Sequence, residues 1–141
     1  DSSAWNLMDL GKLIERNFKT VPENGTLRDI VEAIKHSKRN LFPVVDSENK
    51  FLGLIVMDDL REIIFDTEKY DTYTVRQLMM TFDDKDIVHT SDDLSRVVQK
   101  FQLSNRYNLI VVDDEGSYQG FISRANTFSA YRRFISQSSE E

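Results

Sequence analysis

The sequence predicts an α+β fold made of two similar halves that pack on each other about a pseudo-two-fold axis. The first observation is an internal repeat: residues 21–61 and 88–128 align without a gap at an offset of 67 positions (88 minus 21). The second is that each copy reads strand, helix, strand, strand, helix. The third is the length of 141 residues, which fits one domain but leaves each half marginal alone. We expect a ligand cleft where the halves meet.

The repeat is carried by apolar and turn-forming residues, so it reports the fold and not the chemistry. Each copy is longer than the common solenoid units, and only two copies are present, which favours a pair over an array. The matched positions include Val21 and Val88, Leu27 and Leu94, Val31 and Val98, Arg39 and Arg106, and Gly53 and Gly120.

The composition excludes several classes of function. The chain is 40% hydrophobic and 30% charged, which is typical of a globular domain. Its net charge of −6 disfavours nucleic-acid binding, because the chain repels phosphate backbones. The absence of cysteine excludes disulfides and thiolate metal sites. The acidic clusters match no calcium loop, and no nucleophile or Gly-rich loop is evident, so we expect neither a metal site nor an enzyme.

The apolar runs are too short to cross a membrane. The longest, Phe51–Met57, has seven residues, whereas a membrane helix needs about 20. No signal peptide is evident. The chain begins with Asp1 and has no initiator Met, so we expect it to be part of a longer polypeptide.

The first half is expected to begin after a lead-in segment, residues 1–17, in which Trp5 to Arg16 has roughly helical spacing. Thr26, with Asp29 three residues later, predicts the start of an amphipathic helix. The expected elements are a strand at 18–21, a turn at 22–25, a helix at 26–37, strands at 41–45 and 51–56, and a helix at 57–65. Together they make a first repeat over residues 18–66.

The second half repeats this plan after a linker at 67–80, which ends in a short helical turn at 75–80. Ser91 or Asp92 is expected to cap its first helix. The expected elements are a strand at 87–88, a helix that carries residues 94–101, strands at 108–112 and 118–122, and a helix at 124–135. The second repeat thus spans residues 81–135, and a mobile tail is expected at 136–141.

Each copy carries an apolar run that ends in Asp, followed by a Gly-apolar-Ile pattern. Residues 42–46 read Phe-Pro-Val-Val-Asp and residues 51–55 read Phe-Leu-Gly-Leu-Ile; their counterparts at 109–113 and 118–122 read Leu-Ile-Val-Val-Asp and Tyr-Gln-Gly-Phe-Ile. This tandem pattern resembles a pair of CBS domains, often called a Bateman module. The run from Gly120 to Asn126, and the aromatic and basic residues 131–134, further resemble the C-terminal cytoplasmic domain of CLC-type chloride channels and transporters.

The resemblance implies a non-catalytic regulatory module on the cytoplasmic face of the membrane, in the same polypeptide as a transmembrane channel or transporter domain. CBS pairs commonly bind an adenine nucleotide (ATP, ADP or AMP) between the repeats, and those of CLC proteins usually form homodimers. Two alternatives stay open. The module is attached to a soluble enzyme as a nucleotide sensor, or it is a structural dimerisation module whose clefts bind nothing.

The family's nucleotide signature, Gly-apolar-apolar-Ser/Thr-x-x-Asp, is incomplete in both copies. The resemblance places the hydroxyl near the phosphates and the Asp on the ribose hydroxyls. The first copy keeps Asp59 but has Val56 in place of the hydroxyl, whereas the second keeps Ser123 but has Asn126 in place of the Asp. An amide still accepts a hydrogen bond, so we expect weak nucleotide binding at the second copy.

The candidate nucleotide-binding residues come from both copies. Candidate contacts from cleft-facing basic groups include Arg106 and His89, and the full set is Thr20, Val21, Phe42, Asp59, His89, Arg106, Asn108, Ser123 and Asn126. The last helix also carries Tyr131 and Phe134. These two side chains either pack in the core of the second repeat or contact a partner, because aromatic residues are enriched at interface hot spots. That partner is a second subunit or the membrane domain of the parent protein.

Overall fold

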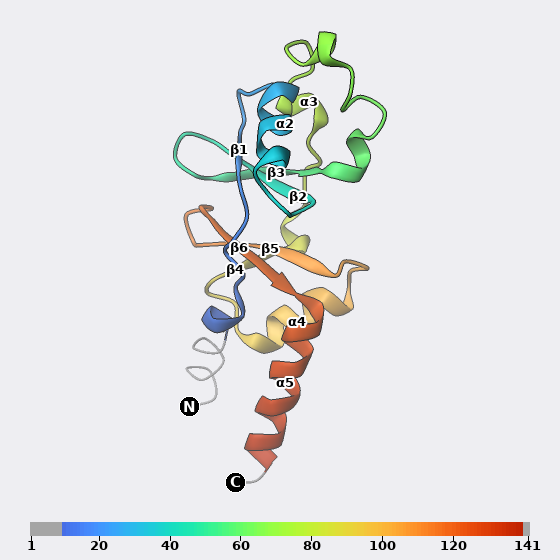
Figure 1. Cartoon of the computed structure of the whole chain (residues 1–141). Helices are drawn as coiled ribbons and strands as arrows, with labels where there is room; N and C mark the ends of the chain where they lie inside the picture. Colours follow the sequence, from blue (N-terminus) through green and yellow to red (C-terminus); the bar gives the residue numbers. More distant parts are fainter. Residues whose placement is uncertain (1–9, 140–141) are drawn as a thin grey trace. The chain divides into compact units, whose positions relative to one another are not determined.

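The computed structural model describes residues 10–139, which form two compact units (Figure 1). The first-repeat unit consists of residues 17–82. The second-repeat unit consists of residues 83–139 together with residues 10–16 from the start of the chain. Each unit holds one three-stranded sheet and helices, so the predicted α+β class with two repeats is confirmed.

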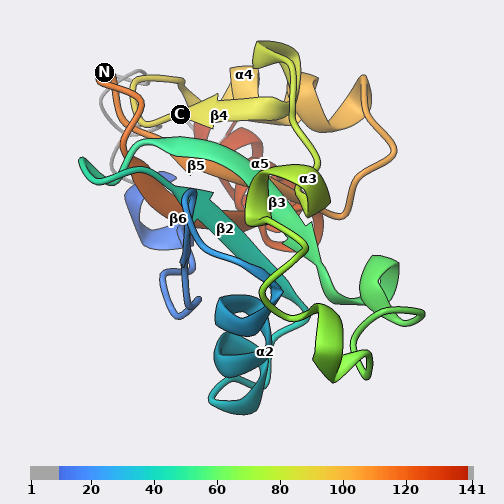
Figure 2. The same cartoon turned by 90° about the horizontal axis from the view of Figure 1, so that it is seen from above.

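The sheet of the first-repeat unit has the order β1-β2-β3, with β1 parallel to β2 and β2 antiparallel to β3. The hairpin bounds match the prediction, whereas the first strand is shorter than the predicted residues 18–21. The α-helix α2 lies on one side of the strands β2 and β3 (Figure 2). The elements are β1 (Val21–Pro22), α2 (Leu27–Lys35), β2 (Leu41–Val45) and β3 (Phe51–Val56).

The second-repeat unit repeats this topology with the order β4-β5-β6. Its elements are β4 (Ile87–His89), α4 (Leu94–Gln102), β5 (Asn108–Val112), β6 (Tyr118–Ser123) and α5 (Arg124–Ser139). The helix α5 follows β6 directly and packs against α4 (Figure 1). It continues through residues 136–139, so the prediction that the tail begins at residue 136 was wrong. The cap of α4 is Asp93, not Ser91 or Asp92, because its carboxylate accepts the Arg96 N–H at 2.8 Å.

The aspartate that ends each Val-Val-Asp run closes the hairpin turn. The Asp46 Oδ1 atom accepts the main-chain N–H groups of Glu48 at 2.8 Å and Lys50 at 2.9 Å. The equivalent Asp113 Oδ1 atom accepts those of residues 115 and 117, both at 2.9 Å. A side chain that accepts hydrogen bonds from the following residues stabilises a turn. This part of the family pattern therefore serves the fold.

Each unit has its own hydrophobic core beneath the sheet. The central strands are buried on both faces: four of the five residues of β2 and of β5 are buried. The first core contains Val21, Leu27, Ile30, Phe42, Val44, Ile55, Leu60 and Val75. The second contains Leu10, Val88, Val97, Phe101, Leu109, Val111 and Ile122. The apolar runs without alternation thus predicted doubly covered strands correctly.

The predicted helix at 57–65 forms only as the 3₁₀ helix η1 (Met57–Leu60), followed by turns. The turns are closed by hydrogen bonds from Ile63 and Ile64 to the Leu60 carbonyl, and the Tyr70 hydroxyl binds the Ile64 carbonyl at 2.6 Å. Phe65 is 86% exposed, so the last turn of a helix here has no core to pack against. Since helices in proteins depend on such packing, the segment does not become a helix.

The segment predicted as a linker is part of the first repeat. It contains η2 (Thr67–Lys69) and α3 (Val75–Leu78). The Tyr73 carbonyl accepts the Leu27 N–H at 2.9 Å at the start of α2, and the Val75 side chain is fully buried in the core. Met80 then exchanges two main-chain hydrogen bonds with Leu54 of β3, both at 2.9 Å. The linker thus completes the first-repeat unit.

Residues 10–16 complete the second repeat in the same way. They include a helical turn at 10–13, and Leu10 is buried in the second core; the rest of the predicted lead-in helix lies outside the described residues. Glu15 exchanges two main-chain hydrogen bonds with Phe121 of β6, at 2.7 and 2.9 Å. Arg16 binds the Gln119 carbonyl at 2.9 Å. Each repeat is therefore closed by the segment that precedes the other repeat in the chain.

The glycine in each Gly-apolar-Ile pattern permits this edge pairing. A Cβ atom on Gly53 would lie 2.6 Å from the Met80 carbonyl oxygen. A Cβ atom on Gly120 would collide with the Glu15 carbonyl and lie 2.8 Å from Ile14 Cγ2, and its φ of +150° also favours glycine. Close approach of the added segment thus explains both glycines.

Over residues 10–139, no helix is both long and apolar enough to cross a bilayer.

Candidate functional site

The second-repeat unit brings several polar residues of the predicted site to one end of its sheet. Asn108 begins β5 and Ser123 ends β6, and the two residues are direct partners in the antiparallel register. The Ser123 Oγ atom accepts the Asn126 N–H at 3.1 Å, at the first turn of α5. Asn108 and Asn126 are exposed, and Ser123 is half-buried. This end of the sheet therefore presents one hydroxyl and two amide side chains.

Arg106 adds a positive charge beside this polar end, two residues before Asn108 in the loop between α4 and β5. Its Nε atom lies 3.9 Å from an Asp86 carboxylate oxygen, and its side chain is 36% exposed. Its main-chain N–H donates to Ser104 Oγ at 3.4 Å. A half-exposed guanidinium carries five N–H donors, so it can bind a phosphate in addition to this neighbour.

His89 lies at the other end of the sheet. The strands β4 and β5 are parallel, and His89 at the end of β4 pairs with Val112 at the end of β5. Asn108 begins β5, four residues before Val112, so it lies at the opposite end of the sheet from His89. The Nε2 atom of His89 lies 2.8 Å from an Asp84 carboxylate oxygen, and the main-chain N–H of His89 donates to the Asp92 carboxylate at 2.9 Å. Within its own unit, the structure therefore does not bring His89 together with Ser123 and Asn126.

A buried lysine joins the start of β4 to the turn that follows this strand. The Lys100 side chain is 5% exposed and donates to the Ile87 carbonyl at 2.6 Å and to the Asp92 carboxylate at 3.0 Å. A buried charge needs such partners. The equivalent position in the first repeat is Ala33. The two repeats therefore differ in how they hold the first helix against the sheet.

The hydrogen bond to His89 lowers the pKa of Asp84 below its usual value, although burial opposes the shift. The charged carboxylate is thus favoured in the folded state, and its contribution to stability is present above the unfolded pKa of about 3.9. That contribution is lost as the pH falls through the lower folded pKa. Because the Asp84 side chain is 81% exposed, the contribution is small.

Replacing His89 with alanine is expected to raise the pKa of Asp84 towards its usual value. A carboxyl-carbon NMR titration of the full chain below about pH 6 measures the change. Asp71 is the internal control, because a hydrogen bond to Arg28 in the other unit lowers its pKa. An unchanged Asp84 titration in the variant would show that His89 does not hold this carboxylate.

The first-repeat unit holds the other four predicted residues. Thr20 precedes β1 and is exposed, and Asp59 lies in η1 and is exposed. Val21 and Phe42 are buried in the first core, so only their main-chain atoms can reach a ligand. Val56, which replaces the signature hydroxyl, ends β3. The first repeat therefore lacks the hydroxyl that the second repeat offers at the same strand end.

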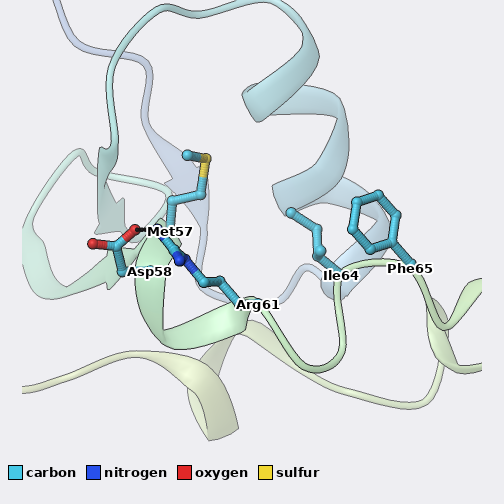
Figure 3. A pocket seen from close by; sticks show the side chains of 5 residues that line it. All are labelled: Met57, Asp58, Arg61, Ile64 and Phe65. Carbon is cyan, nitrogen blue, oxygen red and sulfur yellow. Dashed lines mark hydrogen bonds and ion pairs between the residues drawn. The ribbon is translucent and has the colours of Figure 1, made fainter.

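A shallow hollow follows β3 in the first-repeat unit (Figure 3). Its lining is mainly apolar, and its two charged side chains pair with each other, with Arg61 Nη2 3.2 Å from an Asp58 oxygen. The lining residues are Met57, Asp58, Arg61, Ile64 and Phe65. None of the candidate nucleotide-binding residues lines this hollow.

Among residues 10–139, no group of three or more histidine or acidic side chains has the arrangement of a metal site.

The model of the CBS domain family matches residues 10–66 and 75–132, so this chain belongs to the CBS domain family and carries two copies. The matched ranges include residues 10–16 and 75–80, which belong to the two segments that complete the repeats. A homoserine O-acetyltransferase of Methanococcus vannielii is 28% identical over 116 residues, which cover 81% of this chain and 23% of that protein. An uncharacterized protein of Methanocaldococcus jannaschii is 24% identical over 115 residues, covering 82% and 52%. The chain thus spans about a quarter of the length of the first relative and about half of the length of the second.

Solved structures share the fold. CBSX2 in complex with AMP has a TM-score of 0.66 at 23% identity, and the match covers 89% of this chain and 96% of that one. The CBS pair of a putative Mg²⁺ transporter from Shewanella oneidensis has a TM-score of 0.68 at 15% identity, covering 89% and 70%. The predicted tandem CBS pair is therefore confirmed, and the CLC resemblance is not confirmed by these matches.

Sequence reasoning did not assign a role to Arg124, which follows the signature hydroxyl. Its guanidinium binds three main-chain carbonyls of the α4–β5 region. The signal was present in the repeat itself, because the matched residue of the first copy is Met57. Aligned positions that differ in charge between two copies deserve a structural explanation.

Proposed function

We propose that this chain is a non-catalytic regulatory CBS pair that weakly binds an adenine nucleotide at its second repeat. The observation that carries the proposal is the polar end of the sheet β4-β5-β6, where Ser123, Asn126, Asn108 and Arg106 gather. The Ser123 hydroxyl accepts the Asn126 N–H, so its own proton is available to a ligand oxygen. The likeness to CBSX2, which was solved with AMP, supports an adenine nucleotide as the ligand class.

The roles of the residues follow from their chemistry. Ser123 and Arg106 would bind phosphate oxygens, and Asn126 would accept a ribose hydroxyl in place of the family's Asp. Thr20 and Asp59, both exposed in the first-repeat unit, remain further candidate contacts in this proposal. Replacing a charge-assisted bond by a neutral one costs about 1–3 kcal/mol, so the affinity is about ten- to a hundredfold below that of an intact site.

Calorimetric and thermal-shift titrations of the full chain with ATP, ADP and AMP test the proposal. Ligand at about 100 times its dissociation constant is expected to stabilise the protein by about 2.7 kcal/mol. Ser123→Ala and Asn126→Ala should weaken binding, whereas Asn126→Asp should tighten it because it restores the charged acceptor. If the folded protein shows no saturable binding at nucleotide concentrations up to several millimolar, the proposal of nucleotide regulation is rejected. It would leave the dimerisation role as the function.

For the parent protein, we propose a CLC-type chloride channel or transporter, with this pair on the cytoplasmic face and assembled as a homodimer. Nucleotide occupancy would shift the module between two arrangements and so modulate chloride transport. Tyr131 and Phe134 are half-buried on α5, with ring centroids 6.4 Å apart, and are the proposed dimer contacts. Sequencing the complete reading frame tests the parent, because a channel requires many apolar spans before this module.

A specific observation favours the alternative that the module belongs to a soluble enzyme. The relative named homoserine O-acetyltransferase is about four times as long as the matched region, so most of that protein lies outside the CBS pair. In this alternative the same nucleotide site would regulate a neighbouring catalytic domain. A catalytic domain and no membrane span in the complete reading frame would decide for it.

A further inference from the structure

The Arg124 guanidinium joins α5 to the end of α4. Its Nη2 atom donates to the Phe101 carbonyl at 2.7 Å and to the Ser104 carbonyl at 2.8 Å, and its Nε atom donates to the Arg106 carbonyl at 3.0 Å. The side chain is half-buried, and the guanidinium lies 5.4 Å from the centre of the Phe101 ring. Carbonyls at a helix C-terminus lack partners within the helix and carry negative partial charge, so a guanidinium suits them.

These hydrogen bonds fix the loop over residues 103–107, which leads from α4 to Asn108. The loop is held from two sides, because the Arg124 main-chain N–H also donates to the Tyr107 carbonyl at 2.8 Å. The Arg106 carbonyl is bound directly, so the direction in which the Arg106 side chain leaves the loop depends on Arg124. Loops with few such contacts have low local stability.

The first repeat shows the same loop without this side chain. Met57 is the counterpart of Arg124, and its N–H donates to the Asn40 carbonyl at 2.9 Å, as the Arg124 N–H does to Tyr107. The Met57 side chain has no N–H donor and lines the apolar hollow instead (Figure 3). The two copies thus share the main-chain arrangement and differ in the guanidinium, so Arg124→Met converts the second copy to the first at this position.

We propose that Arg124 is a positioning residue that orders the loop 103–107 and thereby directs Arg106 towards the phosphates of a nucleotide bound at the second repeat. This inference rests on the proposed function, since it names the group that gives the same site its phosphate recognition. The Nε and Nη2 atoms of Arg124 donate to main-chain carbonyls of α4 and of the loop. Its effect on a ligand therefore passes through Arg106.

The test compares AMP with adenosine, which has no phosphate, by calorimetry on the full chain and on three variants. In Arg124→Met the dissociation constant for AMP should rise tenfold or more, while that for adenosine changes less than threefold. Arg124→Lys should restore part of the AMP affinity, because an ammonium can bind one or two of the three carbonyls. Val97→Ala, a buried core change in the same unit, should lower stability and leave the AMP-to-adenosine ratio unchanged.

Amide exchange on the ligand-free proteins gives a readout that needs no nucleotide. Exchange at residues 104–107 should become at least tenfold faster in Arg124→Met and stay unchanged in Val97→Ala. Equal losses of AMP and adenosine affinity, or unchanged exchange in the loop, would overturn the positioning role and leave the proposed function standing. Failure of the unaltered chain to bind AMP at all would overturn both, whatever the exchange rates.

Discussion

Replacing Gly120 with alanine is expected to lower the free energy of unfolding by about 2–5 kcal/mol. The φ of +150° is unfavourable for a residue with a Cβ atom by about 1–2 kcal/mol, and the overlap with Glu15 and Ile14 adds about 1–3 kcal/mol. The Glu15 carbonyl is main chain and is itself hydrogen-bonded to the Phe121 N–H, so it cannot move aside without breaking the pair. Urea unfolding followed by circular dichroism measures the change.

Gly11→Ala is the matched control for this prediction. A Cβ atom at residue 11 would have no neighbour within 4 Å, and the residue lies in a helical turn, so the change should be neutral or stabilise by up to about 1 kcal/mol. Amide exchange at Glu15 and Phe121 locates the damage in the Gly120 variant. An unchanged urea midpoint together with unchanged exchange there would show that the edge pairing does not require glycine.

Replacing Val75 with aspartate is expected to unfold the first-repeat unit. Val75 is fully buried among Val21, Leu27 and Leu60, and an unpaired carboxylate there has no partner to offset its loss of water. The cost of about 4 kcal/mol or more is comparable to the total stability of a small domain, which is about 5–15 kcal/mol. Amide exchange or NMR line positions of α2 and β2 in the full chain report the loss.

The control is Thr72→Asp, three residues earlier in the same segment. Thr72 is exposed, so this change should alter stability by no more than about 0.5 kcal/mol. Equal tolerance of the two substitutions would mean that residues 70–80 act only as a connection and not as part of the first core. A selective effect of Val75→Asp would establish that this segment belongs to the repeat.

The hairpins were predictable because their signals are local. Five-residue apolar runs end at Asp46 and Asp113, whose side chains close the turns, and each is followed by a second apolar run. The helix at 57–65 was predicted wrongly because apolar spacing alone does not tell whether a surface exists to cover the helix. In the second copy α4 packs against α5, whereas Phe65 in the first copy points to solvent.

The assignment of the connecting segments was not predictable from their own residues. The sequence of residues 10–16 does not indicate whether this segment pairs with Phe121 or with the repeat that follows it directly. That choice depends on contacts between residues far apart in the chain. For the site, the signature predicted Ser123 and Asn126 as nucleotide contacts, but it carried no information on Arg124, whose partners are main-chain carbonyls.

The edge pairing of Glu15 with Phe121 also has a consequence for protein synthesis. About a hundred residues separate the two partners, and a ribosome adds roughly 5–20 residues per second, so the first partner waits about 5–20 seconds for the second. Until residues 83 onward have been made, Leu10, Leu13 and Ile14 have no apolar surface of their own unit to cover them. A nascent chain halted before residue 83 therefore leaves an apolar segment exposed.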